Sequence, residues 1–216
     1  MAHPLSSLLL TPEAVNAYNK LFVSLFAVKR VAHGLQTIWA DAMRTDHRTP
    51  RLPRAKARTL YPACAVLSSM MYVVRNIQSW LHVDLIEAEW AVLSARVEEA
   101  RARRDFEALR RAHTSWLAVL GRGVLLGATA ANGAASPVAA AMHGTLRRCV
   151  RFTALVKAAG KGDATECSAQ ALDSIGRGFD RDAAKLLAAV ERAGLAELAV
   201  RLDFCGRGFG SREAAL

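Results

Sequence analysis

The stretch that decides the fold runs from Thr11 to Met43 and reads TPEAVNAYNKLFVSLFAVKRVAHGLQTIWADAM. Thr11 can cap a first helical turn, and Pro12 suits the first helical position because its missing N–H needs no partner there. Apolar residues recur at helical spacing on two sides: Val15, Tyr18, Phe22, Leu25, Ala32 and Trp39 on one, and Leu21, Val28, Val31, Leu35 and Ile38 on another. Because a helix that is apolar on two sides is normally buried between neighbours, we predict a long central helix.

The remaining sequence also has helical periodicity. A second apolar pattern begins near Ala63 and continues to the arginine-rich stretch at 101–104, and a kink near Val83–Asp84 stays open. Asp105 can cap a third helix, which weakens from Gly121 onward, and Ser136-Pro137 can open a fourth, which stops at Gly160. Two further patterns cover 172–190 and 195–204. No segment alternates strictly with β-branched enrichment, so the sequence predicts an all-α fold, an elongated antiparallel bundle of five or six helices.

We expect a single helical domain over residues 1–216. Residues 45–62, TDHRTPRLPRAKARTLYP, are rich in proline and basic side chains, and both oppose packing, so this segment is predicted to be an exposed loop. Residues 205–216 are rich in glycine at their start and are predicted to form a flexible tail.

The composition limits the possible partners. The chain has 216 residues with 29 basic and 19 acidic side chains, a net charge of +10, so an acidic partner is favoured. The start lacks a charged n-region, and no apolar run approaches the length of a membrane span, so we predict a soluble, cytoplasmic protein. The four cysteines stand far apart, without a CxxC pair, and are expected to be reduced thiols.

The sequence contains few signs of catalysis. The histidines form no HxxxH or HExxH pair, so we predict no enzyme activity, no metal site and no cofactor. His113 lies on the apolar face of its predicted helix, where a ligand or base is conceivable but a hydrogen-bonded core or interface histidine is favoured. The tryptophans fall on helical stripes and are expected to be core or interface anchors.

Four blocks of sequence carry a family resemblance. The first helix contains Thr11-Pro12, Tyr18-Asn19-x-x-Phe22, Val28-Lys29-Arg30-Val31 and Leu35-x-x-x-Trp39; the second reads NIQSWLHVDLIE over 76–87. Arg104-Asp105-Phe106-Glu107 opens the third block, and Arg201-Leu202-Asp203-Phe204 closes the series. In this order, the blocks resemble the C-terminal domain of the gamma-tubulin complex components, and the component four subfamily is the most similar.

The resemblance implies a function. Members of this family are helical proteins whose C-terminal half binds gamma-tubulin. Their N-terminal halves, absent from this chain, associate laterally with other gamma-tubulin complex components, so that the gamma-tubulins form a template for microtubule nucleation at the centrosome, the spindle pole and other microtubule-organising centres. The component itself catalyses no reaction. Matched positions that could face the surface are the candidate gamma-tubulin-binding residues: Lys29, Arg30, Asn76, Gln78, Trp80, Asp84, His113, Asp203 and Phe204.

An alternative from another class is a basic helical module that binds nucleic acid through Arg44–Arg58 and Arg96–Arg111. Arginines gathered on one continuous face would favour this alternative, whereas a mixed-charge face with exposed apolar anchors would favour a tubulin partner. An enzyme would need a pocket that brings His82 or His113 to a carboxylate, and nothing in the sequence predicts one.

Overall fold

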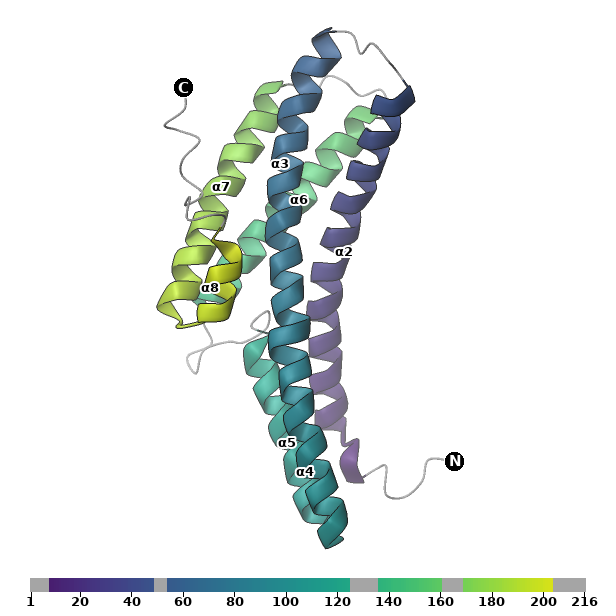
Figure 1. Cartoon of the computed structure of the whole chain (residues 1–216), viewed down its shortest axis with the longest axis vertical. Helices are drawn as coiled ribbons and strands as arrows, with labels where there is room; N and C mark the ends of the chain where they lie inside the picture. Colours follow the sequence, from purple (N-terminus) through teal and green to yellow (C-terminus); the bar gives the residue numbers. More distant parts are fainter. Residues whose placement is uncertain (1–7, 49–53, 125–135, 161–168, 204–216) are drawn as a thin grey trace. The chain divides into compact units, whose positions relative to one another are not determined.

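The structure is a computed structural model, and it describes residues 8–48, 54–124, 136–160 and 169–203. Every regular element in these ranges is helical, so the all-α prediction is confirmed (Figure 1). Six helical runs lie between Pro12 and Leu202 in this part of the chain, and the second combines α3, the π-helical η1 and α4 without a break. The bounds are α2 Pro12–Arg48, α3 Arg54–Ser79, η1 Trp80–Glu87, α4 Ala88–Arg103, α5 Phe106–Gly123, α6 Pro137–Gly160, α7 Ala169–Arg192 and α8 Ala196–Leu202.

Helices begin where the capping residues predict. Thr11 precedes α2, and its Oγ1 accepts a hydrogen bond from the Ala14 amide at 3.3 Å. Asp105 precedes α5 and accepts from the Ala108 amide at 2.9 Å. α6 begins at Pro137, directly after Ser136. At Thr11 and Asp105 the side-chain acceptor satisfies an amide that has no partner within the helix. The three predicted starts coincide with those of α2, α5 and α6, so they are confirmed.

The predicted loop at 45–62 is wrong at both ends. α2 continues to Arg48 and α3 begins at Arg54, and only 49–53 lie outside the described residues. The physical reason is propensity: alanine, arginine, lysine and leucine dominate 54–60 and are good helix formers. The kink left open near Val83–Asp84 falls within η1, where the backbone widens to π-helical geometry. The predicted tail, 205–216, lies outside the described residues.

The chain divides into two compact units, each drawn from two stretches. Unit 1 combines Met1–Ala27 with Gln78–Ala139, and unit 2 combines Val28–Ile77 with Ala140–Leu216. Each unit is discontinuous in sequence. The expectation of one domain over residues 1–216 stays a prediction.

Unit 1 contains the first turns of α2 together with η1, α4 and α5. α4 packs on α5, and a tight turn makes the two helices antiparallel (Figure 1). Arg104 forms this turn in the left-handed conformation at φ 53°, with its amide bonded to the last carbonyls of α4, and Asp105 caps the next helix. The buried side chains of this unit are Leu21, Trp80, Leu81, Leu93, Ala100, Ala112, Leu117, Leu120 and Val124, with Val138 and Ala139 from the start of α6.

Unit 2 contains the rest of α2, nearly all of α3 and α6, and the whole of α7 and α8. The Tyr72 hydroxyl on α3 donates to the Arg201 carbonyl on α8 at 2.9 Å, and Arg148 on α6 pairs with Asp182 on α7 at 2.6 Å. Its largest fully buried side chains are Phe152, Phe179, Leu35, Leu67, Met70, Ile77, Met142, Leu186, Leu198, Leu202 and Val28. These contacts join helices that are far apart in sequence.

Candidate functional site

An exposed apolar stripe runs along the first half of α2. It consists of Val15, Tyr18, Phe22 and Phe26, which recur every three or four residues and therefore share one face. Phe22 is 64% exposed and Phe26 is 54% exposed. The prediction that Val15, Tyr18 and Phe22 are buried is therefore wrong. The other predicted side is buried throughout, at Leu21, Val28, Val31, Leu35 and Ile38.

Aromatic rings extend this stripe across unit 1. Phe22 and Phe26 stack with ring centroids 5.7 Å apart and planes at 14°. The Tyr18 ring lies 6.1 Å from the Trp116 ring on α5, which lies 6.1 Å from the Trp90 ring on α4 in an edge-on arrangement. Trp90 is itself 58% exposed. We call this set, Val15, Tyr18, Phe22, Phe26, Trp90 and Trp116, the aromatic surface.

His113 anchors one member of the aromatic surface. Its Nε2 is hydrogen-bonded to the Tyr18 hydroxyl at 2.8 Å, which confirms the prediction of a hydrogen-bonded histidine. Burial lowers the pKa of His113 and raises the pKa of Tyr18, because both charged forms lose solvent. The hydrogen bond links the first turns of α2 to α5 within unit 1. Among the described residues, no group of three histidine, cysteine or acidic side chains could hold a metal ion.

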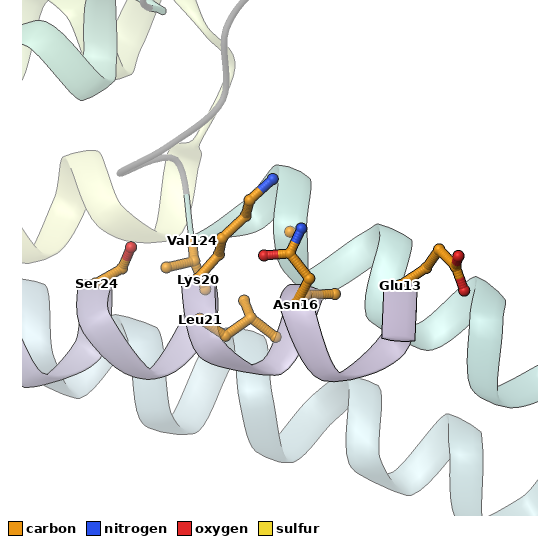
Figure 2. Close-up of a pocket in the computed structure, with 8 residues that line it drawn as sticks. Glu13, Asn16, Lys20, Leu21, Ser24 and Val124 are labelled. Carbon is orange, nitrogen blue, oxygen red and sulfur yellow. The ribbon is translucent and has the colours of Figure 1, made fainter. Parts of the chain in front are cut away.

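A groove of about 240 Å³ lined by both polar and apolar residues lies on another side of α2. Glu13, Asn16, Lys20 and Ser24 follow one another along this side, about half a helical turn from the apolar stripe (Figure 2). Leu21 and Val124 supply apolar lining. α2 thus presents an apolar face and a separate polar face within the same unit.

The predicted site residues do not all gather in one unit. Lys29, Arg30, Asn76 and Asp203 belong to unit 2, whereas Gln78, Trp80, Asp84 and His113 belong to unit 1. Phe204 lies outside the described residues. Lys29, Arg30 and Asp203 are exposed, and Asn76, Gln78, Asp84 and His113 are partly buried. The Asn76 amide donates to the Tyr72 carbonyl within its own helix at 2.9 Å.

The prediction that Trp80 could face the surface is wrong, because only 5% of this residue is exposed. It follows Val73 and Ile77 at helical spacing and precedes Leu81, and all of these are buried. A large indole on such a stripe is covered with its neighbours, so Trp80 is not available at the surface.

Sequence reasoning missed Phe26 and the exposure of Trp90. The spacing of Phe26 from Val15 and Phe22 is the signal that could have found it. The spacing defines a shared face but does not say whether that face is covered.

Arginines and carboxylates are interleaved along the arginine-rich stretch from 96 to 111. Arg101 pairs with Glu98 at 3.7 Å, Arg103 with Glu99 at 2.7 Å and Arg110 with Glu107 at 2.6 Å. A protein binds a nucleic-acid backbone through a row of cations that neutralise its phosphates. The arginines of this stretch are instead interleaved with carboxylates. The nucleic-acid alternative is therefore not supported for this stretch. The side chains of Arg44–Arg58 lie outside the described residues.

None of the helices, over their described residues, is both long and apolar enough to cross a bilayer.

Comparisons with known proteins identify the family. The model of the family described as "Gamma tubulin complex component C-terminal" matches residues 1–206. The chain is similar to gamma-tubulin complex component 4 of Mus musculus and of Homo sapiens, in each case with 29% identity over 206 residues that cover 91% of this chain and 28% of the relative. It is 28% identical to gamma-tubulin complex component 4 of Arabidopsis thaliana over 123 residues, 52% of this chain and 16% of that protein. The chain thus spans less than a third of the length of these relatives. It belongs to the gamma-tubulin complex component family, in the part that the family model describes as C-terminal.

Proposed function

We propose that this chain binds gamma-tubulin as part of a gamma-tubulin complex and so contributes to microtubule nucleation at microtubule-organising centres of the cytoskeleton. Membership of the family and the names of the curated relatives support this proposal. The role is that of a scaffold and not of an enzyme. One chain that holds one gamma-tubulin cannot by itself form a template, so binding, and not nucleation, is the activity to test first.

The observation that carries the proposal is the aromatic surface. Single exposed apolar residues are ordinary, but a contiguous set on one helical unit is typical of an interaction site. Tyrosine, tryptophan and phenylalanine are enriched at the cores of protein interfaces, where aromatic side chains bury large areas. Phe22, Phe26 and Trp90 combine high exposure with support from ordered helices.

Charge supports an acidic partner of the tubulin type. The chain carries a net charge of +10, and Lys29 and Arg30 are exposed in the turn of α2 that follows Phe26. Complementary charge accelerates encounter more than it strengthens the final complex. Among the residues proposed from the family resemblance, Lys29, Arg30 and Asp203 are suited to direct contact, and Asn76, Gln78, Asp84, His113 and Phe204 stay candidates. Trp80, which is buried, would affect binding only indirectly, by supporting the helices from the core.

The test is binding of purified gamma-tubulin to the immobilised chain, measured by biolayer interferometry at about 0.15 M salt, where exposed charges are largely screened beyond ~8 Å. The double variant Phe22→Ser/Phe26→Ser should weaken binding by about tenfold or more, ~1.4 kcal/mol, because two exposed anchors are lost. Lys29→Glu should slow association more than it speeds dissociation.

The matched control is Val200→Ser, which removes another exposed apolar side chain, on α8 of unit 2. It should leave binding within about twofold, because it lies outside the aromatic surface. Alpha/beta-tubulin and duplex DNA serve as competing ligands. Equal capture of DNA and gamma-tubulin, or equal losses for the double variant and Val200→Ser, would contradict the proposal.

A further inference from the structure

Another surface of unit 1 is a groove of about 350 Å³ lined by residues of α4 and α5. Arginine side chains border it, and small residues form its floor. The lining residues are Arg96, Glu99, Ala100, Arg103, Ala108, Arg111, Ala112 and Ser115. We call this the arginine groove.

The antiparallel hairpin explains the shape of the groove. Arg104 and Asp105 turn the chain within two residues, so α4 and α5 pack along their lengths. Ala100 and Ala112 are both buried and contribute only a methyl group each. Small side chains leave a shallow channel, while the longer arginine stems rise beside it.

The three arginines of the groove differ in how closely they pair with carboxylates. Arg103 is held by Glu99 at 2.7 Å. The ion pair between Arg111 and Asp105 is the longest in this hairpin, with 4.0 Å between the charged atoms. Arg96 has no ion pair within the part of the chain that the structure describes. Three arginines and one carboxylate line the groove, and Asp105 lies beside Arg111, so the local charge is +1 (three minus two). Arg96 and the loosely paired Arg111 are therefore the groups most available to a ligand.

We propose that the arginine groove binds an acidic peptide segment of a partner protein. Aspartate or glutamate side chains of that segment would pair with Arg96 and Arg111, because the guanidinium fork matches a carboxylate in two parallel hydrogen bonds. The alanine floor lets the peptide backbone approach closely, and the exposed Ser115 hydroxyl can donate to it. This inference does not depend on gamma-tubulin binding by the aromatic surface.

The groove fits a peptide better than a nucleic acid. Its lining contains no aromatic ring on which a base could stack, and stacking supplies much of the affinity for single strands. Glu98, Glu99 and Glu107 lie on the same hairpin and interrupt the row of cations that a duplex backbone needs. A peptide can place its carboxylates beside Arg96 and Arg111 and its neutral backbone atoms beside these glutamates.

The experiment measures fluorescence anisotropy of a labelled peptide of about eight glutamates with the full chain at about 50 mM salt, where exposed charges are weakly screened. A peptide of glutamines with the same length is the uncharged comparison. Arg96→Gln/Arg111→Gln should weaken glutamate-peptide binding by about tenfold or more. The control Arg122→Gln/Arg151→Gln removes the same charge from exposed positions outside the groove and should change binding by less than about threefold.

Ser115→Trp tests the groove without a change of charge. Its indole should fill the channel and reduce binding to a similar extent, and circular dichroism checks that each variant stays folded. Equal losses for the two arginine double variants would overturn the proposal in favour of diffuse charge. No binding of the glutamate peptide, or its displacement by a lower concentration of an oligonucleotide of equal charge, would also overturn it.

Discussion

Arg148 on α6 lies directly against Gly178 on α7. A Cβ atom at Gly178 would stand 2.7 Å from the Arg148 Cζ and closer still to one of its terminal nitrogens. The same guanidinium is held by Asp182 through an Nε to Oδ2 contact of 2.6 Å, and the two side chains are only 28% and 18% exposed. Glycine at 178 therefore makes room for a partly buried ion pair between two helices of unit 2.

Gly178→Ala should be less favourable than a glycine-to-alanine change at an open helical position by about 1 kcal/mol or more, because the added methyl displaces the Arg148 guanidinium from Asp182 and so offsets the gain in helix propensity. Urea unfolding followed by circular dichroism measures this change. Gly144→Ala on α6 is the matched control, since a Cβ there would meet no atom within 4 Å. It should be neutral or stabilising by up to about 1 kcal/mol, because alanine favours helix more than glycine does. Similar effects of the two substitutions would show that Arg148 does not restrict position 178.

The hydrogen bond between Tyr18 and His113 predicts a pH dependence of stability. Burial lowers the pKa of folded His113 below its ordinary value of 6.5, so near and below that pH the unfolded chain binds more protons than the folded chain. The stability due to this group is complete above 6.5 and is lost as the pH falls from there toward the folded pKa.

His113→Gln should reduce this loss, because glutamine can accept from the Tyr18 hydroxyl but does not titrate. Urea unfolding at about pH 7.5 and pH 5.5, one unit on either side of the ordinary histidine value, gives the comparison. The parent chain should lose more stability over this range than His113→Gln. Equal losses would mean that other groups account for the pH dependence.

The thiol of Cys149 should be inert in the folded chain. The side chain is completely buried, and this burial raises the pKa of the thiol to about 12. Because the thiolate is the reactive form, both access and ionisation oppose its modification. In a variant with Cys64, Cys167 and Cys205 changed to serine, an aromatic disulfide reagent should label Cys149 only in denaturant. Rapid labelling of this variant under native conditions would contradict the described burial.

The cap of α5 contributes a measurable part of the stability of unit 1. Asp105→Ala removes the acceptor for the Ala108 amide and should cost about 0.5–2 kcal/mol. Asp105→Asn keeps an oxygen at this position and should recover most of the loss, although it removes the charge beside Arg111. Thermal unfolding of the three chains measures the difference. If asparagine were as destabilising as alanine, the charge and not the cap would be the stabilising feature.

Local chemistry made the helix boundaries predictable. Thr11-Pro12, Asp105 and Ser136-Pro137 each combine a capping group with a compatible first residue, so the sequence alone indicates where α2, α5 and α6 begin. The π-helical geometry of η1 could not be predicted, because its residues carry no distinctive pattern. Helix propensity across 54–60 outweighed the prolines from which the loop at 45–62 was predicted.

The candidate binding surface was harder to predict than the fold. α2 has two apolar sides, and periodicity could not say that Leu21 and Val28 would be covered while Phe22 would be exposed. The family resemblance supplied candidate residues in sequence order, but these residues fall into two units. Burial of Trp80 also depends on tertiary packing, which single-sequence patterns do not contain.

The way the two units interleave along the chain limits how any binding region can be mapped. The crossings between units occur after Ala27, Ile77 and Ala139, and each lies inside a helix, in α2, α3 and α6 respectively. A deletion that removes either unit must therefore sever helices that also belong to the other, so lost binding in a truncated chain would not identify a contact. For this molecule, single substitutions on exposed faces can distinguish a contact from a support, and shortened chains cannot.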